Sequence, residues 1–295
     1  MNIADTKNLI KLPNKLRDPY IFEEILEITN EYNYSKIDMS QIVFIEPYSM
    51  LSTLLLGKNY LIKTGNKIKL VNIPVNIHQY LERMDFISKE IFEIDTPLNQ
   101  KLKLKRSLKS AKLLEIYEIP NKERESIKSI NLVISEFRKR ASYILKYWIS
   151  DSIVDYFITV ISELCQNIFE HSMNSGYISM QTYSVGNKNT FCLAICDSGI
   201  GIKESLKNKI EEKEKNSADY IKSALFTPIS SKRDFGFGLC QVNSIVEKLN
   251  GSIFIRSYDA FVAAMYNTKK DISGHKIFQK TDLCKFQGTQ IAITL

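Results

Sequence analysis

Apolar residues recur every three or four positions between residues 153 and 168, which is the period of an α-helix with one buried face. The stripe consists of Ile153, Phe157, Val160, Ile161, Leu164 and Ile168. Glu163, Asn167 and Glu170 fall nearly opposite this stripe. The pattern predicts a helix that buries one side in a core and presents a carboxylate and a carboxamide, one turn apart, on the other.

A continuous apolar run from Phe191 to Cys196 predicts a strand that is buried on both faces. The run ends abruptly in Asp197-Ser-Gly199-Ile-Gly201. Glycines at this spacing let the backbone approach a flat ligand closely, and the aspartate can accept a hydrogen bond from an exocyclic amine. The end of this strand is therefore a candidate binding site for a planar ligand.

Two glycine-containing segments follow further along the chain. Gly236-Phe-Gly238 opens a predicted helix, and exposed backbone N–H groups at such a helix start can bind an anion. The apolar positions of this helix are Leu239, Val242, Ile245, Val246 and Leu249. Gly288-Thr289 precedes a last predicted strand, Gln290–Leu295.

In this order, the four segments resemble the N, G1, G2 and terminal Gly-Thr motifs of the GHKL superfamily. This is the ATP-binding domain shared by sensor histidine kinases, gyrase-type ATPases and anti-sigma-factor serine kinases. The resemblance covers residues 113–295 and implies an α/β sandwich that binds ATP with Mg²⁺. A strand and two helices precede the N motif here, as in the anti-sigma branch.

The resemblance also implies a role for individual residues. Glu163 would be the general base, and Asn167 would be a Mg²⁺ ligand. The adenine end would be formed by Asp197, Gly199, Gly201 and Thr289, and the phosphates would be held by Gly236 and Gly238. His171 is interpreted as a packed or hydrogen-bonded helix residue.

The segment between the glycine motifs, residues 203–235, mixes glutamates with lysines and is predicted to be solvated and partly helical. The resemblance makes it the ATP lid, a segment that orders over bound nucleotide. Near its end, Lys232 or Arg233 is expected to reach the β- or γ-phosphate. Residues 258–286 are weakly patterned, and no chemistry is assigned to them.

Strands and helices alternate before residue 95, which predicts an N-terminal α/β domain. The predicted helices are Ile21–Ile28, Tyr48–Lys63 and a short one through Leu81, and the predicted strands are Lys36–Ser40, Ile42–Ile45 and Lys67–Ile73. The segment Ile37–Leu51 resembles the core of a STAS domain, the fold of anti-sigma-factor antagonists. Phosphorylatable members carry a serine directly after the acidic residue of this turn, where this chain has Pro47, and Ser49 lies two residues further on. The resemblance therefore implies a binding or docking surface.

Charge and composition set the remaining expectations. Six of the twelve residues 101–112 are basic and the net charge is +7, but no aromatic residues interleave them, so a solvated linker is favoured over nucleic-acid binding. The predicted organisation is a STAS-like domain at 1–95, a linker at 96–112 and the ATP-binding domain at 113–295.

No segment approaches the roughly 18 consecutive apolar residues of a membrane span, and a cytoplasmic location is expected. Five cysteines without a CxxC pair predict reduced thiols.

Three classes of function remain open. No histidine lies between His78 and His171, which argues against an ordinary histidine kinase. The first class is a serine/threonine protein kinase that acts on a protein partner, such as a regulator or an anti-sigma-type target. The second is an ATPase whose lid and dimer contacts respond to nucleotide, and the third is a non-catalytic, ATP-gated interaction switch. Glu163 favours the first two classes, but the same carboxylate serves water and a protein hydroxyl alike.

Overall fold

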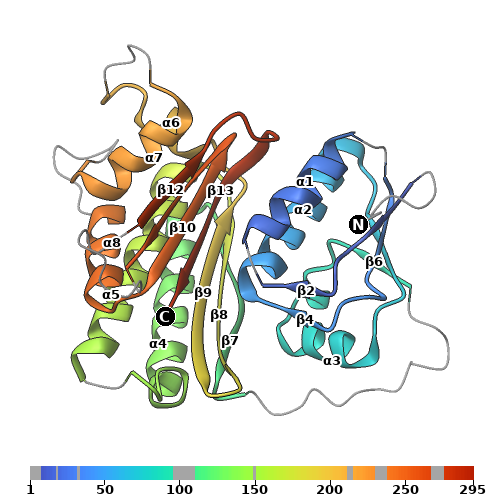
Figure 1. Cartoon of the computed structure of the whole chain (residues 1–295), viewed down its shortest axis with the longest axis horizontal. Helices are drawn as coiled ribbons and strands as arrows, with labels where there is room; N and C mark the ends of the chain where they lie inside the picture. Colours follow the sequence, from blue (N-terminus) through green and yellow to red (C-terminus); the bar gives the residue numbers. More distant parts are fainter. Residues whose placement is uncertain are drawn as a thin grey trace. The chain divides into compact units, whose positions relative to one another are not determined.

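A computed structural model describes residues 8–17, 19–31, 34–95, 110–148, 151–210, 215–229, 238–266 and 276–295. The chain divides into two compact units, Met1–Ser110 and Ala111–Leu295. Each unit combines helices with strands, which confirms the predicted mixed α/β class (Figure 1).

The first unit is built on short parallel strands. Its four-stranded sheet has the order β1-β3-β5-β6, formed by β1 (Leu9–Lys11), β3 (Lys36–Asp38), β5 (Lys69–Val71) and β6 (Glu93–Ile94). A second parallel pair joins β2 (Lys15–Leu16) to β4 (Phe44–Ile45). The helices are α1 (Pro19–Glu31), α2 (Pro47–Thr64), α3 (Val75–Arg83) and the short 3₁₀ helix η1 (Ile87–Lys89). The three predicted helices are confirmed, whereas β1, β2 and β6 were not predicted.

Helix α2 accounts for the proline at position 47. Pro47 is the first residue of α2, a position at which a missing N–H costs no hydrogen bond and the fixed φ suits the helix. The helix ends at Gly65, whose φ of 72° is left-handed and whose N–H donates to the Leu61 carbonyl. Pro47 therefore serves to start the helix.

The second unit contains a seven-stranded antiparallel sheet in the order β12-β11-β10-β13-β9-β8-β7. The strands are β7 (Leu113–Ile119), β8 (Gly176–Val185), β9 (Lys188–Asp197), β10 (Ser252–Tyr258), β11 (Ala260–Met265), β12 (Lys276–Lys280) and β13 (Phe286–Thr294). The predicted strands at 113–119, 191–196 and 290–295 are confirmed within β7, β9 and β13, with small differences at their ends.

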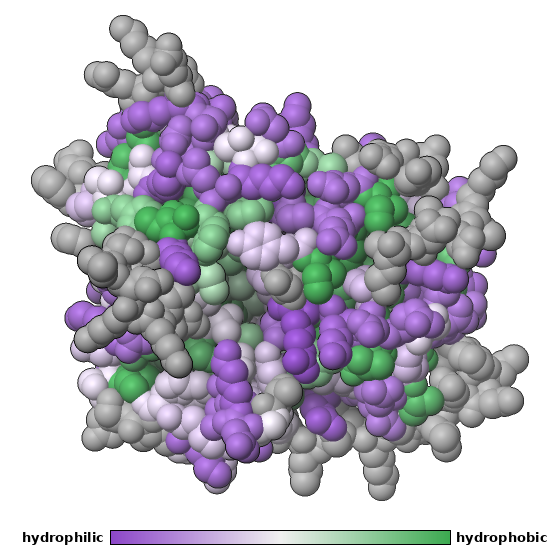
Figure 2. Space-filling model, viewed as in Figure 1, coloured by the Kyte–Doolittle hydropathy of each residue, from purple (hydrophilic) through white to green (hydrophobic). Residues whose placement is uncertain are grey.

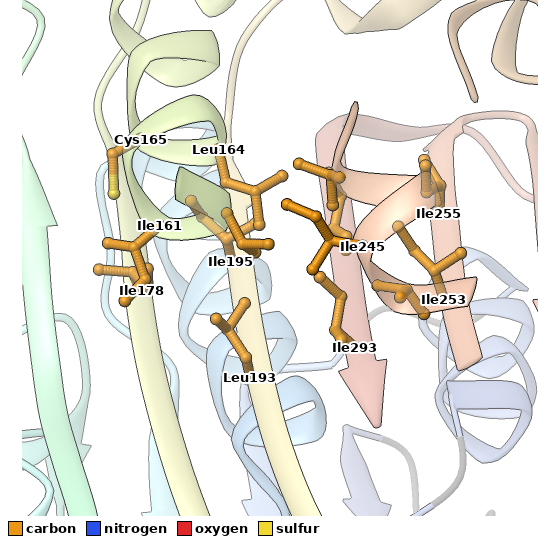
Figure 3. Close-up of a cluster of buried hydrophobic side chains, with 14 of the residues drawn as sticks. Ile161, Leu164, Cys165, Ile178, Leu193, Ile195, Ile245, Ile253, Ile255 and Ile293 are labelled. Carbon is orange, nitrogen blue, oxygen red and sulfur yellow. The ribbon is translucent and has the colours of Figure 1, made fainter. Parts of the chain in front are cut away.

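Helices of the second unit lie along one face of this sheet (Figure 1). They are α4 (Glu123–Ile144), α5 (Asp151–Asn167), α6 (Gly201–Leu206), α7 (Ser217–Phe226) and α8 (Gly238–Lys248), and a π-helical segment, η3 (Ile168–Ser172), continues α5. Figure 3 shows the core between these layers, where Leu164 of α5 and Ile245 of α8 meet Ile195 of β9 and Ile293 of β13. This core fixes the ends of α5, β9 and β13 relative to one another.

Helix α7 corrects one expectation about the segment 203–235. Partial helicity is confirmed, but a solvated character is wrong for α7, because it buries Ala218, Tyr220, Ile221, Ala224 and Leu225. Asn216 caps the helix and exchanges hydrogen bonds with Asp219 in a capping box. Residues 258–286 likewise contain β11, which is largely buried, and the exposed edge strand β12.

The described surface is polar with separate apolar patches, as Figure 2 shows for one face of the molecule. None of the helices in the described ranges has both the length and the apolar character needed to cross a bilayer. All five cysteines lie in the described ranges, where none forms a disulfide, and Cys165, Cys192 and Cys196 are buried.

Candidate functional site

One pocket of the second unit collects most of the residues that the motifs single out. Its cavity volume is about 220 Å³, and it lies where α5, η3, β9, β13 and the start of α8 meet. Six predicted site residues line it: Glu163, Asn167, Asp197, Gly201, Gly238 and Thr289. These positions come from four separate segments of the chain, so the fold brings the four motifs together.

Helix α5 supplies the polar side of the pocket. Glu163 and Asn167 are one turn apart, both line the pocket and both are partly exposed, whereas Leu164 and Cys165 are buried in the core. Burial raises the pKa of the Cys165 thiol, so this cysteine stays protonated and unreactive. The helix thus presents its carboxylate and carboxamide to the cavity, as its apolar period predicts.

The π-helical segment η3 connects the end of α5 to the loop that follows β9. The Ser172 carbonyl accepts a hydrogen bond from the Ile200 N–H at 3.1 Å, and Asn174 Nδ2 donates to the Ser198 carbonyl at 3.3 Å. A π-helical turn is rare and is frequently found at functional sites. Here it fixes the two motif-bearing segments to each other.

Three residues of η3 to which the motifs give no role also line the pocket, namely Glu170, His171 and Ser172. His171 lies beside Glu170, with 3.8 Å between His171 Nε2 and Glu170 Oε2. The sequence indicates that His171 faces the pocket, because it lies four residues after Asn167 and therefore on the same side of a helix.

The loop after β9 is shaped by close backbone contacts. Asp197 is buried, and its Oδ1 accepts a hydrogen bond from the Gly199 N–H at 2.8 Å. A Cβ atom on Gly199 would lie 2.1 Å from the Ser172 carbonyl oxygen, a distance that no side chain can adopt. Gly201, which lines the pocket, has a φ of 79°, in the left-handed region that favours glycine.

The start of β13 closes the same end of the pocket. Gly288 has a φ of 95°, and a Cβ atom there would lie 1.8 Å from the Asp197 carbonyl oxygen. Thr289 pairs directly with Asp197 across the β9–β13 ladder. The terminal Gly-Thr pair is therefore packed against the aspartate of the β9 motif.

The start of α8 faces the polar groups of α5. A Cβ atom on Gly238 would lie 3.7 Å from Asn167 Oδ1 and 4.0 Å from Glu163 Oε2. The described part of α8 begins at Gly238, and backbone N–H groups at a helix start are available to an anion. An anion bound there would lie beside Asn167 and Glu163.

Apolar side chains complete the walls, and these were not assigned to the site from sequence. They include Ile195, Ile202, Leu206, Ala224, Ile229 and Ile291. Such a lining, with few polar groups at defined positions, is typical of pockets for small organic ligands. Lys232, Arg233 and Gly236 lie outside the described residues, as do residues 101–109 of the basic linker, and their assigned roles stay predictions.

Comparison with known families bears directly on this unit. Residues 153–293 match the family described as histidine kinase-, DNA gyrase B-, and HSP90-like ATPase. The matched stretch contains all four motifs and supports a GHKL-type ATPase domain here, and with it the binding of ATP. No curated protein matches the chain.

Proposed function

We propose that the second unit binds Mg·ATP and transfers the γ-phosphoryl group to a serine or threonine hydroxyl of a protein partner, as anti-sigma-factor kinases do. Water is the competing acceptor, which would make the protein an ATPase. The observation that carries the proposal is the position of Gly238, which lies close to both Asn167 and Glu163. A Cβ atom on Gly238 would be 3.7 Å from Asn167 Oδ1 and 4.0 Å from Glu163 Oε2. A phosphate at the start of α8 would therefore have a metal ligand and a base beside it.

We assign the adenine ring of the nucleotide to the end of the pocket opposite the start of α8. Asp197 is a buried carboxylate that can accept a hydrogen bond from the exocyclic amine of adenine. Gly201 lines the pocket, whereas Gly199 lets the loop pack against Ser172, and Ile195 and Ile291 offer apolar surface to the ring. This combination suits a planar, partly polar ring.

Asn167 fits the role of a Mg²⁺ ligand. Its side-chain oxygen is neutral and lines the pocket next to the start of α8. Mg²⁺ prefers oxygen ligands and is usually held by one or two protein groups together with phosphates and waters. When bound, the ion would offset charge on the phosphates.

Glu163 is the proposed general base. Its carboxylate would accept the proton of the attacking hydroxyl while that oxygen forms a bond to the γ-phosphorus and the bond to the β-phosphate oxygen breaks. The products are a phosphorylated hydroxyl, or inorganic phosphate when water attacks, together with ADP. A positioned base of this kind accelerates such a step by about 10²–10⁴-fold.

Incubation with γ-labelled ATP and Mg²⁺, alone and with a cell lysate, separates the three classes of function. Label on a lysate protein is the expected result and identifies a kinase. Release of free phosphate alone would identify an ATPase. Bound nucleotide with neither product would leave a non-catalytic switch.

The same experiment tests the role of the first unit, which we propose to be a STAS-like regulatory or docking domain that does not accept phosphate. Pro47 occupies the acceptor position of the STAS pattern and has no hydroxyl. We expect no label in residues 8–95 after tryptic mapping of the labelled chain. Stoichiometric phosphate on Ser49 would contradict this role.

Nucleotide affinity tests the pocket itself. Asp197→Asn and Asn167→Ala should each weaken Mg·ATP binding by about 1–3 kcal/mol. The first replaces a carboxylate oxygen that accepts a hydrogen bond by an NH2 donor, and the second removes the proposed Mg²⁺ ligand. Asn167→Ala should lose affinity only when Mg²⁺ is present, whereas Asp197→Asn should lose it with or without the metal. Calorimetric titration measures both, and wild-type affinity in both variants would refute the pocket.

A further inference from the structure

Three polar side chains stand in one row across the sheet at the pocket. Asp197 on β9 pairs with Thr289 on β13, and Thr289 pairs with Ser257 on β10. Side chains of directly paired residues project on the same side of a sheet. Asp197 and Thr289 line the pocket, and Ser257 lies behind them, buried and outside the pocket lining.

Ser257 connects this row to the loop that follows β9. Its Oγ accepts a hydrogen bond from the Ile202 N–H at 2.8 Å. A Cβ atom on Gly201 would lie 2.9 Å from the same oxygen, so the loop passes close to Ser257. The hydroxyl therefore holds the backbone that carries Gly201 into the pocket.

The Ser257 hydroxyl also lies close to the hydroxyl of Thr289. Ser257 Oγ lies 3.5 Å from Thr289 Oγ1, and either atom can be the donor by geometry alone. Ser257 Oγ accepts from the Ile202 N–H, and because the side chain is buried, its own hydrogen also needs an acceptor. Within the described chain, Thr289 Oγ1 is the acceptor that remains for it. Thr289, having accepted, can direct its hydroxyl hydrogen into the pocket.

We propose that Ser257 is a positioning residue that makes Thr289 a hydrogen-bond donor and thereby selects adenine over guanine. Asp197 accepts hydrogen bonds and Thr289 then donates one, which matches the exocyclic amine and the unprotonated N1 of adenine. Guanine has a carbonyl where adenine has its amine, and an N1–H where adenine has an unprotonated N1. The carbonyl would then face the acceptor Asp197, and the N1–H would face the donor Thr289. The inference rests on the proposed nucleotide-binding function and adds its base selectivity.

The test is the affinity of the full chain for ATP and GTP, measured by calorimetry with Mg²⁺. Ser257→Ala should weaken ATP binding about 10-fold, as expected for a lost hydrogen bond at a buried site, and leave GTP binding nearly unchanged. The ATP-to-GTP preference should fall by about the same factor. Ser257→Thr, which keeps the hydroxyl, should restore the preference.

A matched control and a double variant separate positioning from general stability. Ser179→Ala removes another buried serine hydroxyl of the same sheet, which donates to the Leu114 carbonyl at 3.0 Å and lies outside the pocket lining. It should change neither affinity. In a Thr289→Val background, Ser257→Ala should not alter the preference further, because its effect passes through the threonine hydroxyl.

The outcomes are distinct. Equal loss of ATP and GTP affinity in Ser257→Ala, or a full further change of preference in the double variant, would overturn the positioning role and leave the nucleotide site standing. Unchanged affinities for ATP and GTP in Ser257→Ala would also overturn the positioning role. If the unaltered chain bound neither nucleotide, the proposed function would fail, and the role of Ser257 with it.

Discussion

Replacing Glu163 by alanine is expected to leave Mg·ATP affinity within a few-fold of wild type and to lower turnover about 10²–10⁴-fold. The carboxylate lies beside the start of α8, where it would meet the attacking hydroxyl or water and not the adenine ring. It therefore acts on the transition state much more than on bound nucleotide. Calorimetry measures the affinity, and release or transfer of labelled phosphate measures the turnover.

Glu247→Ala is the matched control for this substitution. Glu247 is an exposed carboxylate on α8 and lies outside the pocket lining, so its removal should change neither quantity. Two results would remove Glu163 from the mechanism: turnover equal to wild type, or losses of affinity and turnover that are equal in size.

Gly288→Ala should produce the largest loss of stability. The left-handed backbone costs about 1–2 kcal/mol for a residue with a Cβ atom. In addition, the new atom would lie 1.8 Å from the Asp197 carbonyl oxygen, so β13 would have to separate from β9. We expect a total loss above about 3 kcal/mol, in the range that marks a disrupted core or backbone, and loss of nucleotide binding.

The chain supplies both the control and the probe for this prediction. Gly186 also has a left-handed φ, 58°, but nothing lies within 4 Å of a Cβ atom there. Gly186→Ala should therefore lose only the stability that the left-handed backbone costs a residue with a Cβ atom. The single tryptophan, Trp148, belongs to the second unit and packs against Phe191. Its fluorescence during urea unfolding reports the stability of that unit, and similar losses in the two variants would contradict the collision at Gly288.

Long periodic elements and glycine motifs of the second unit can be read from the sequence. The apolar stripe of α5 fixes which residues face the core, and Glu163 and Asn167 follow on the other side. Strands β1 and β2 have only three and two residues and show no alternation, whereas β4 and β5 are as short but lie within the longer patterned runs Ile42–Ile45 and Lys67–Ile73. The burial of α7 escapes prediction because its apolar residues lie in a segment in which lysine and glutamate are frequent.

The assembly of the pocket depends on strand register, which a single sequence does not carry. Asp197, Thr289 and Ser257 become neighbours only because β13 lies between β9 and β10 with this pairing. Ser257 belongs to no motif that was recognised, and its role follows from its contact with Ile202. The π-helical form of η3, which holds His171, is likewise not predicted by hydrophobic periodicity, although the spacing of His171 from Asn167 indicates the side on which it lies.

The central place of β13 has a consequence for how the protein is made. This strand, Phe286–Thr294, lies between β9 and β10, although both of these precede it in the chain. While the ribosome is still synthesising residues before 286, β9 and β10 each lack a neighbour, and the inner face of the sheet cannot close. Folding of the second unit must therefore await the last residues of β13, and until then its apolar strands are open to chaperones and to aggregation.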